Sequence, residues 1–489
     1  MSQGEINELQ VVSCDVDALF SNSAISTKNG ILEGQLFIPE YQRPYTWGEK
    51  EVNRLVGDLI AYFSSEKPPE HQYYLGSVII HQSIVDGVTR LNVIDGQQRL
   101  TTLAILAYVL GLPNQPRITY TSPSSQQQIA ANVQWLKTWL ADNREIEHCD
   151  LKALIKLEQI NITLVITESE DDAYRFFETQ NTGGVRLNGA DIIKAHHLRA
   201  IEEKYQDSYA KQWESLGELT PLIDAIMKVR YWQAFRFKSL PTHRKPHLVK
   251  TEIVKELAES CLNQPVNVAY RTVQVTKPHT GVATNSLSGI QINNIDNGYA
   301  MRQPLNSGIN TIDYLSYFAQ LQHDLLLNER TLANLDAFYD FYFNDVIQKL
   351  DGTAYLKKLF DSTLLLYVSQ FGLTQLHEAA LWLFRMVYSP RVINQKTVKE
   401  SSIQSFARDN KLFDFIVLSY THEQLIGWLK EYSYTFEGSN LDDKKVKGRF
   451  IIRLENFFKP KTFTRETIQT SFDKQLCQAI QSKVNEAQT

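Results

Sequence analysis

Apolar positions in the first 120 residues follow two different periods. Between 49 and 63 they recur at steps of three and four residues, which is the pattern of one buried helix face. The stretches 73–80 and 91–95 are short and mainly apolar, as buried strands are, and Asp86-Gly87 between them signals a hairpin turn. These elements predict an α+β module.

Further along, the pattern becomes mainly helical. In chain order we expect an apolar helix over 97–110 that ends at Gly111, a loop over 113–128, a helix over 134–154, a strand over 161–167, and helices from 172 onward with a polar interruption over 263–310. The sequence therefore predicts two domains: an α+β domain over 1–210 and a mainly α-helical region over 211–489.

Composition narrows the class of protein. The 489 residues are 43% hydrophobic and 21% charged, with a net charge of -5, which is typical of a globular protein and excludes intrinsic disorder. The longest apolar run, 103–112, is short of the roughly 20 residues that a bilayer span needs, so we expect a cytoplasmic protein with no membrane contact. The four cysteines lie more than 100 residues apart, which argues against a disulfide framework or a zinc knuckle.

The segment 95–102, Asp-Gly-Gln-Gln-Arg-Leu-Thr-Thr, carries the sharpest candidate chemistry. A buried strand turns here directly into a helix, whose first N–H groups and positive dipole end attract anions. Arg99 in the first turn adds a guanidinium fork that matches phosphate oxygens. Helix initiation is the alternative explanation for Asp95 and Gln98, which have the spacing of an N-cap and a capping box.

Two further segments attract attention. Between Pro39 and Pro44, Gln42 and Arg43 are flanked by the aromatic residues Tyr41, Tyr45 and Trp47, which either stack on a base or pack in the core. At 176–187, Gly183-Gly184 precedes a helix, which suits either close approach of a ligand or a plain turn.

Together these segments resemble the N-terminal domain of the GmrSD-type modification-dependent restriction systems, which also opens the phosphorothioate-sensing defence protein SspE. The matching marks are Tyr41-Gln42-Arg43 with Trp47, Gly76-Ser77, Asp95 through Arg99 with Thr101-Thr102, and Phe177-Glu178 with Asn181, Gly184, Leu187 and Lys194. The resemblance covers roughly 10–205. It implies a ParB-like core that binds and hydrolyses a nucleoside triphosphate, with Mg²⁺, in antiphage DNA restriction.

The resemblance also implies the site residues. The expected catalytic set is Asp95, Gln97, Gln98 and Arg99; the expected nucleotide-binding set is Tyr41, Gln42, Arg43, Trp47, Gly76, Ser77, Gly96, Thr101, Thr102, Asn181, Gly184 and Lys194. Arg43 and Arg99 would neutralise phosphate oxygens, and Asp95 would orient Arg99 or hold Mg²⁺.

The second half departs from the family. Full-length relatives carry a C-terminal HNH nuclease, but nothing after 210 fits that motif, and His243 and His247 lie among prolines that prevent them from converging on a metal. We therefore expect no protein metal site of the nuclease kind in this half of the chain. A basic run with interleaved phenylalanines is a candidate DNA contact, with a solvated helix face as the alternative; its residues are Lys444, Lys445, Lys447, Arg449, Lys459 and Lys461.

The favoured hypothesis is a nucleotide-dependent sensor or regulatory subunit of an antiphage restriction system. Its expected partners are a nucleoside triphosphate, DNA and a separately encoded nuclease, and a homo-oligomer is left open. The first alternative is a non-hydrolysing module that a nucleotide switches between DNA- or protein-binding states. A chain that cleaves DNA itself ranks last, because no cluster of three acidic residues lies near the 95–99 motif.

Overall fold

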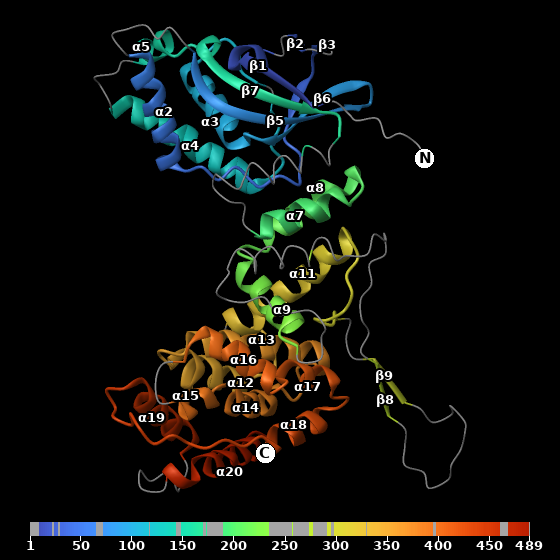
Figure 1. Ribbon diagram of the computed structural model, residues 1–489, viewed down its shortest axis with the longest axis vertical. Helices are drawn as coiled ribbons and strands as arrows, with labels where there is room; N and C mark the ends of the chain where they lie inside the picture. The colour runs from blue at the N-terminus through green and yellow to red at the C-terminus, as the bar shows by residue number, and fades with distance from the viewer. Residues whose placement is uncertain are drawn as a thin grey trace. The chain divides into compact units, whose positions relative to one another are not determined.

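A computed structural model describes the protein over most of its length. The described residues are 9–21, 24–27, 30–64, 72–116, 118–142, 148–169, 173, 189–233, 257, 273–276, 291–294, 298–328, 330–394, 398–459 and 468–488. The chain divides into two compact units, 1–215 and 216–489 (Figure 1). Each unit is described by itself.

A five-stranded mixed sheet organises the described part of the first unit, with strand order β1-β7-β5-β6-β4. Its strands are β1 (Gln10–Asp15), β4 (Gln35–Phe37), β5 (Tyr73–Val85), β6 (Val88–Asp95) and β7 (Ile160–Thr167), and β2 (Ile25–Thr27) pairs separately with β3 (Gly30–Leu32). The β1–β7 and β5–β6 pairs are antiparallel, whereas β5–β7 and β4–β6 are parallel.

The β5–β6 hairpin confirms the turn predicted at Asp86-Gly87. Both residues have positive φ, 51° and 78°, as a two-residue type I′ turn requires. Further along β5, the register against β7 shifts between Tyr74 and Gly76. This bulge is important for the candidate site.

Helices gather on one side of the sheet and bury its apolar face (Figure 1). They are α1 (Val16–Phe20), α2 (Glu49–Phe63), α3 (Gln97–Leu110), α4 (Pro123–Asp142) and α5 (His148–Leu154), with a 3-10 turn at Leu157–Gln159. The helices predicted over 49–63 and 97–110 are confirmed. The loop predicted over 113–128 is wrong in its last part, because Pro123 opens α4 as a first-turn proline can.

The α7 (Gly189–Arg199) and α8 (Glu203–Ser215) helices complete the first unit. The second unit is helical apart from one short strand pair in its described residues. Its elements are α9 (Thr220–Tyr231), β8 (Val273–Thr276), β9 (Gln291–Asn294), α11 (Ile309–Gln322), α12 (Asp336–Tyr339), α13 (Ala354–Phe371), α14 (Leu376–Val387), α15 (Ser389–Ile393), α16 (Glu400–Asp409), α17 (Leu412–Leu418), α18 (His422–Glu431), α19 (Val446–Phe458) and α20 (Ile468–Gln488), with π-helical turns at His323–Leu327 and Asp340–Asp345 and a 3-10 turn at Ile347–Lys349.

Aromatic side chains form much of the core of the second unit. Phe384 contacts the rings of Phe341, Phe360, Tyr388 and Phe450, with centroid distances between 4.7 and 6.3 Å. The fold class is α+β with a helical C-terminal region, as the sequence predicts. Within the described ranges, no helix combines the length and apolar character needed to cross a membrane.

Candidate functional site

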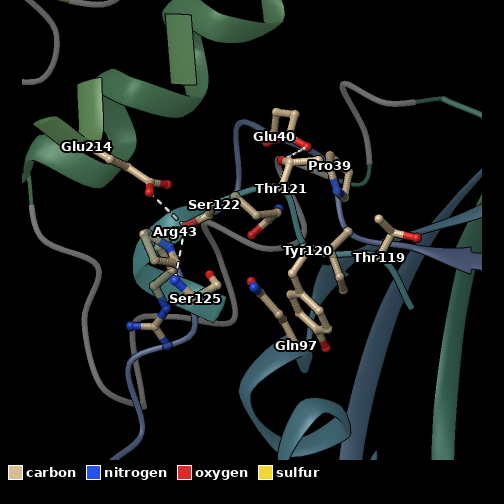
Figure 2. Close-up of a pocket in the computed structure, with 13 residues that line it drawn as sticks. Pro39, Glu40, Arg43, Gln97, Thr119, Tyr120, Thr121, Ser122, Ser125 and Glu214 are labelled. Atoms are coloured by element: carbon tan, nitrogen blue, oxygen red, sulfur yellow. Dashed lines mark hydrogen bonds between the residues drawn. The ribbon is translucent and has the colours of Figure 1, made fainter. Parts of the chain in front are cut away.

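A pocket opens beside the start of α3, and it brings together two of the segments identified in the sequence. It holds about 270 Å³ of space not filled by atoms, part of it open to solvent. Its lining residues are Ile38, Pro39, Glu40, Gln42, Arg43, Pro44, Gln97, Thr119, Tyr120, Thr121, Ser122, Ser125 and Glu214 (Figure 2). The 38–44 loop after β4, the first residue of α3 and the segment leading into α4 therefore meet at one place.

The first turn of α3 begins at a glycine, not at an aspartate cap. Gly96 is the N-cap, with φ 94°, and a Cβ there would lie 2.8 Å from Val78 Cγ2. Asp95 is the last residue of β6, and no side chain caps the helix. The capping-box explanation of Asp95 and Gln98 is thus wrong, because a left-handed glycine separates Asp95 from the helix.

The Arg99 guanidinium lies under the β5 bulge. Its Nη1 donates to the Leu75 carbonyl at 3.0 Å and its Nη2 to the Ser77 carbonyl at 2.7 Å, and Asp95 Oδ2 lies 3.8 Å from Nη2. Gly76, at φ 121°, permits this approach, since a Cβ there would lie 2.1 Å from Nη1. Arg99 therefore holds the strand bulge, and it is not among the residues that line the pocket.

Gln98 hydrogen-bonds the loop that carries Gln42 and Arg43. Its Oε1 accepts hydrogen bonds from the Thr46 and Trp47 amides at 2.9 and 3.2 Å, and its Nε2 donates to the Pro44 carbonyl at 3.0 Å. The side chain is buried. Gln98 thus fixes the chain that follows Arg43, and it too lies outside the pocket lining.

A series of buried hydrogen bonds connects Gln98 to α4. Asn132 Nδ2 donates to the Tyr45 hydroxyl at 3.0 Å, Tyr45 contacts the Thr102 hydroxyl at 2.8 Å, and Thr102 donates to the Gln98 carbonyl at 2.9 Å. Burial raises the pKa of Tyr45. The aromatic residues of the 41–47 segment are packed in the fold, since Tyr41 is buried and Trp47 lies against the hydrophobic core.

By contrast, three motif side chains that line the pocket carry polar groups with no hydrogen bond or ion pair to the described part of the protein. Gln42 and Gln97 are 9% and 5% exposed, and among the described residues no protein group hydrogen-bonds either carboxamide. Arg43 lines the pocket as well, and no carboxylate of the described chain forms an ion pair with it. Figure 2 shows Gln97 extending into the middle of the group.

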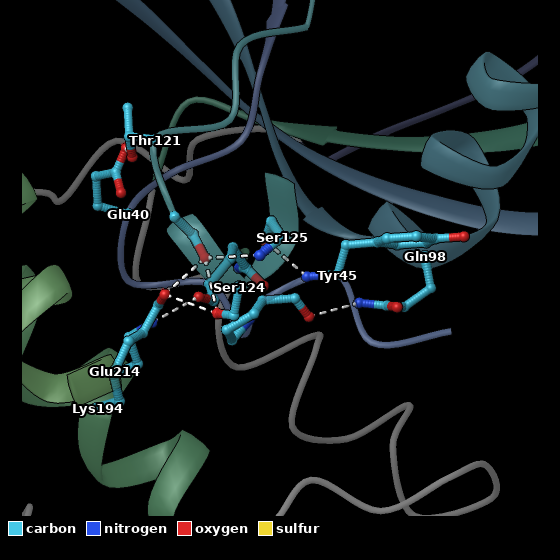
Figure 3. A network of polar contacts seen from close by, with 11 residues as sticks. Glu40, Tyr45, Gln98, Thr121, Ser124, Ser125, Lys194 and Glu214 are labelled. Carbon is cyan, nitrogen blue, oxygen red and sulfur yellow. Dashed lines mark hydrogen bonds and ion pairs between the residues drawn. The ribbon is translucent and has the colours of Figure 1, made fainter. Parts of the chain in front are cut away.

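Lys194 and Glu214 attach the α7–α8 pair to this pocket (Figure 3). Lys194 Nζ lies 3.2 Å from the Gln42 carbonyl and 3.3 Å from Glu214 Oε1. Glu214 Oε2 accepts from the Ser122 and Ser124 hydroxyls at 2.7 and 2.8 Å. Burial lowers the pKa of Lys194, and the Glu214 carboxylate opposes that shift. Lys194 of α7 thus contacts the backbone of the 38–44 loop.

Glu40 is the second carboxylate of the lining. It accepts a hydrogen bond from the Thr121 hydroxyl. Burial raises the pKa of Glu40, the Thr121 bond opposes that rise, and nearby Asp207 and Glu214 add to it. Sequence reasoning missed Glu40, Ser122 and Glu214 as site residues; only Ser122, directly before Pro123, had a local signal, that of a helix cap.

The remaining predicted residues of this site are placed as follows. Thr101 contacts the Tyr120 hydroxyl at 2.7 Å, and Gly76 and Ser77 belong to the bulge under Arg99. Asn181 and Gly184 lie outside the described residues.

Two of the predicted DNA contacts are engaged within the second unit. Lys447 is buried and donates to Glu437 Oε2 at 2.6 Å and to the Glu437 carbonyl at 2.9 Å. Arg449 is exposed but pairs with Asp351 Oδ2 at 2.6 Å. Lys444, Lys445 and Lys459 are exposed, whereas Lys461 lies outside the described residues.

Metal ligands do not gather in the part of the chain that the structure describes. There, no group of three or more His, Cys, Asp or Glu side chains is placed to hold a metal ion. His243 and His247 lie outside the described residues.

Comparison with known proteins relates the two units to different families. Residues 18–198 match the N-terminal domain of GmrSD restriction endonuclease, and residues 205–445 match a family of unknown function (DUF7834). An uncharacterized protein of Methanocaldococcus jannaschii is 30% identical over 102 residues, which cover 19% of this chain and 17% of that protein. The match thus spans a small part of that relative. The N-terminal match relates the chain to restriction systems.

Proposed function

Because residues 18–198 belong to the GmrSD N-terminal domain family, we propose that this chain is the nucleotide-dependent sensor or regulatory subunit of an antiphage restriction system. In this proposal the first unit is a ParB-like domain that binds and hydrolyses a nucleoside triphosphate. One observation carries it: Gln42, Arg43 and Gln97, from motifs far apart in sequence, line one pocket with uncommitted polar groups.

We assign the motif residues two kinds of role, according to the contacts that their side chains make. Arg43 is the cation available to phosphate oxygens. Gln98 and Arg99 act as positioning residues, because their polar atoms are bonded to the 44–47 loop and the β5 bulge.

Mg²⁺ would arrive with the phosphates, since it keeps several waters and takes only one or two protein carboxylates. Asp95 is the partly exposed carboxylate at the strand-to-helix turn and is the candidate to contact it.

The second unit is proposed to contact DNA and a separately encoded nuclease. Lys444, Lys445 and Lys459 are the exposed cations available for phosphate contacts, whereas Lys447 is excluded because its ammonium is buried against Glu437.

Phosphate release measured with each of the four nucleoside triphosphates tests the proposal. Arg43→Ala should weaken nucleotide binding by roughly 10- to 100-fold, because it removes a charge-assisted hydrogen bond that contributes about 1.5–3 kcal/mol. Arg54→Ala is the matched control, since Arg54 is an exposed arginine on α2 that is not part of the pocket lining. A protein that neither binds nor hydrolyses any triphosphate would refute the proposal.

A non-hydrolysing switch is the second candidate. The engagement of Gln98 and Arg99 in protein contacts favours it, because neither side chain is directed at a ligand in the pocket. Tight nucleotide binding without phosphate release would select this candidate over the hydrolase.

A further inference from the structure

The pocket beside α3 is too small to enclose a whole nucleoside triphosphate. It holds about 270 Å³ of space not filled by atoms, and part of that space is open solvent. Only one part of the nucleotide enters it, so the chemistry of the lining decides which part.

The charges of the lining disfavour phosphate. The two carboxyl groups among the lining residues are those of Glu40 and Glu214, and the cation among them is Arg43. Figure 2 shows Arg43 at one end of the group, with Tyr120 and Thr119 at the other. Glu214 is already paired with Lys194, so Glu40 is the carboxyl group of the lining that would disfavour a phosphate, whereas a phosphate beside Arg43 would be neutralised.

The uncharged groups of the lining fit a nucleobase. Gln97 is 5% exposed and Gln42 is 9% exposed. Neither carboxamide has a protein hydrogen-bond partner within the described chain. The polar atoms of both carboxamides keep access to solvent, so they are available to a ligand that enters the pocket. A carboxamide offers a donor beside an acceptor, which is the pattern that base edges present.

We infer that this pocket takes the base of the nucleotide, that Gln42 and Gln97 hydrogen-bond its edge, and that the triphosphate lies outside it against Arg43. The inference rests on the nucleotide-binding function proposed above and assigns Gln97 to recognition of the base. The carboxylate of Glu40, which holds one hydrogen bond from Thr121, is then an acceptor for a base or sugar donor.

Binding of the four nucleoside triphosphates and of inorganic tripolyphosphate to the full chain tests the inference. The unmodified protein should prefer one base over the others, and Gln97→Leu should weaken binding of the preferred nucleotide about tenfold, the effect of about one lost hydrogen bond. Tripolyphosphate binding should be unchanged by Gln97→Leu and weakened by Arg43→Ala. Gln134→Leu, an exposed glutamine on α4, is the matched control.

Each outcome separates this inference from the proposal beneath it. If tripolyphosphate binds as tightly as every nucleotide, or if Gln97→Leu weakens both ligands equally, the assignment of the base to the pocket is wrong while nucleotide binding stands. Equal affinity for the four nucleotides overturns it in the unmodified protein, without any variant. If no triphosphate binds at all, the proposed function itself fails.

Discussion

The Lys194–Glu214 pair allows a quantitative test of how the α7–α8 pair is held against the pocket. The Lys194 side chain is 2% exposed and that of Glu214 is 11% exposed, so both charges lie away from bulk water. Glu214→Gln keeps an oxygen acceptor for the Ser122 and Ser124 hydroxyls but removes the charge that compensates Lys194. We expect the variant to be less stable than the unmodified chain.

The size of the loss follows from the burial of Lys194. Removing one partner of a buried ion pair typically costs about 3–5 kcal/mol. The ceiling at pH 7 is about 5 kcal/mol, the free energy of taking a proton from a lysine of ordinary pKa near 10.5. Since a neutral folded Lys194 would bind fewer protons than the unfolded chain, the deficit should shrink as pH rises, by about 1.4 kcal/mol per pH unit.

Urea denaturation of the full chain at pH 7, 8 and 9 measures this deficit. Lys194→Met combined with Glu214→Gln should recover part of the loss, because no buried charge then remains. The exposed pair Lys211–Asp207 on α8 is the control, and its disruption should leave stability unchanged within error. A deficit that is independent of pH, together with a double variant no more stable than Glu214→Gln, would refute the reasoning.

Three further predictions concern other parts of the molecule. Burial lowers the pKa of His377 from 6.5 to about 4, so its contribution to stability is present above pH 6.5 and lost as pH falls toward 4. His377→Leu should therefore reduce the loss of unfolding free energy between pH 6.5 and 4, as measured by urea denaturation. An unchanged loss in the variant would contradict this prediction. Gly76→Ala should destabilise by about 1–3 kcal/mol from its positive φ, and Arg99→Ala in the same chain should relieve the added clash, as thermal melts would register. Lys444→Gln with Lys445→Gln should weaken DNA binding and reduce its salt slope by up to about two; equal slopes would exclude contact by these lysines.

Local signals in the sequence predicted the secondary structure around the site better than they predicted the contacts between its side chains. The three-to-four residue period of 49–63, the Asp86-Gly87 turn and Gly111 each act through the chain within a few residues, and the structure confirms all three. The loop predicted over 113–128 from its Pro, Ser and Gln content is wrong in its last part, because a proline such as Pro123 can also open a helix.

The candidate site could be predicted only in part, because its side chains meet partners distant in sequence. Gln98 and Arg99 are adjacent in the sequence, yet one binds the 44–47 loop and the other the β5 bulge. Nothing in the residues around Glu214 indicates that it meets Ser122, 92 positions earlier. Such pairings depend on the register of the sheet and on the docking of α8, which a residue period does not encode.

The long-range pairing of β1 has a consequence for the order in which the protein is made. In the described chain β1 pairs with β7, and Ser13 hydrogen-bonds Asn161, 148 positions later. The β1 strand can therefore join the sheet only after β7 has been synthesised. The lining of the pocket is complete only when Glu214 has been synthesised as well. A ribosome-bound chain therefore carries β1 without its sheet partner for most of the synthesis of the first unit, which leaves the edge of that strand open to other pairings.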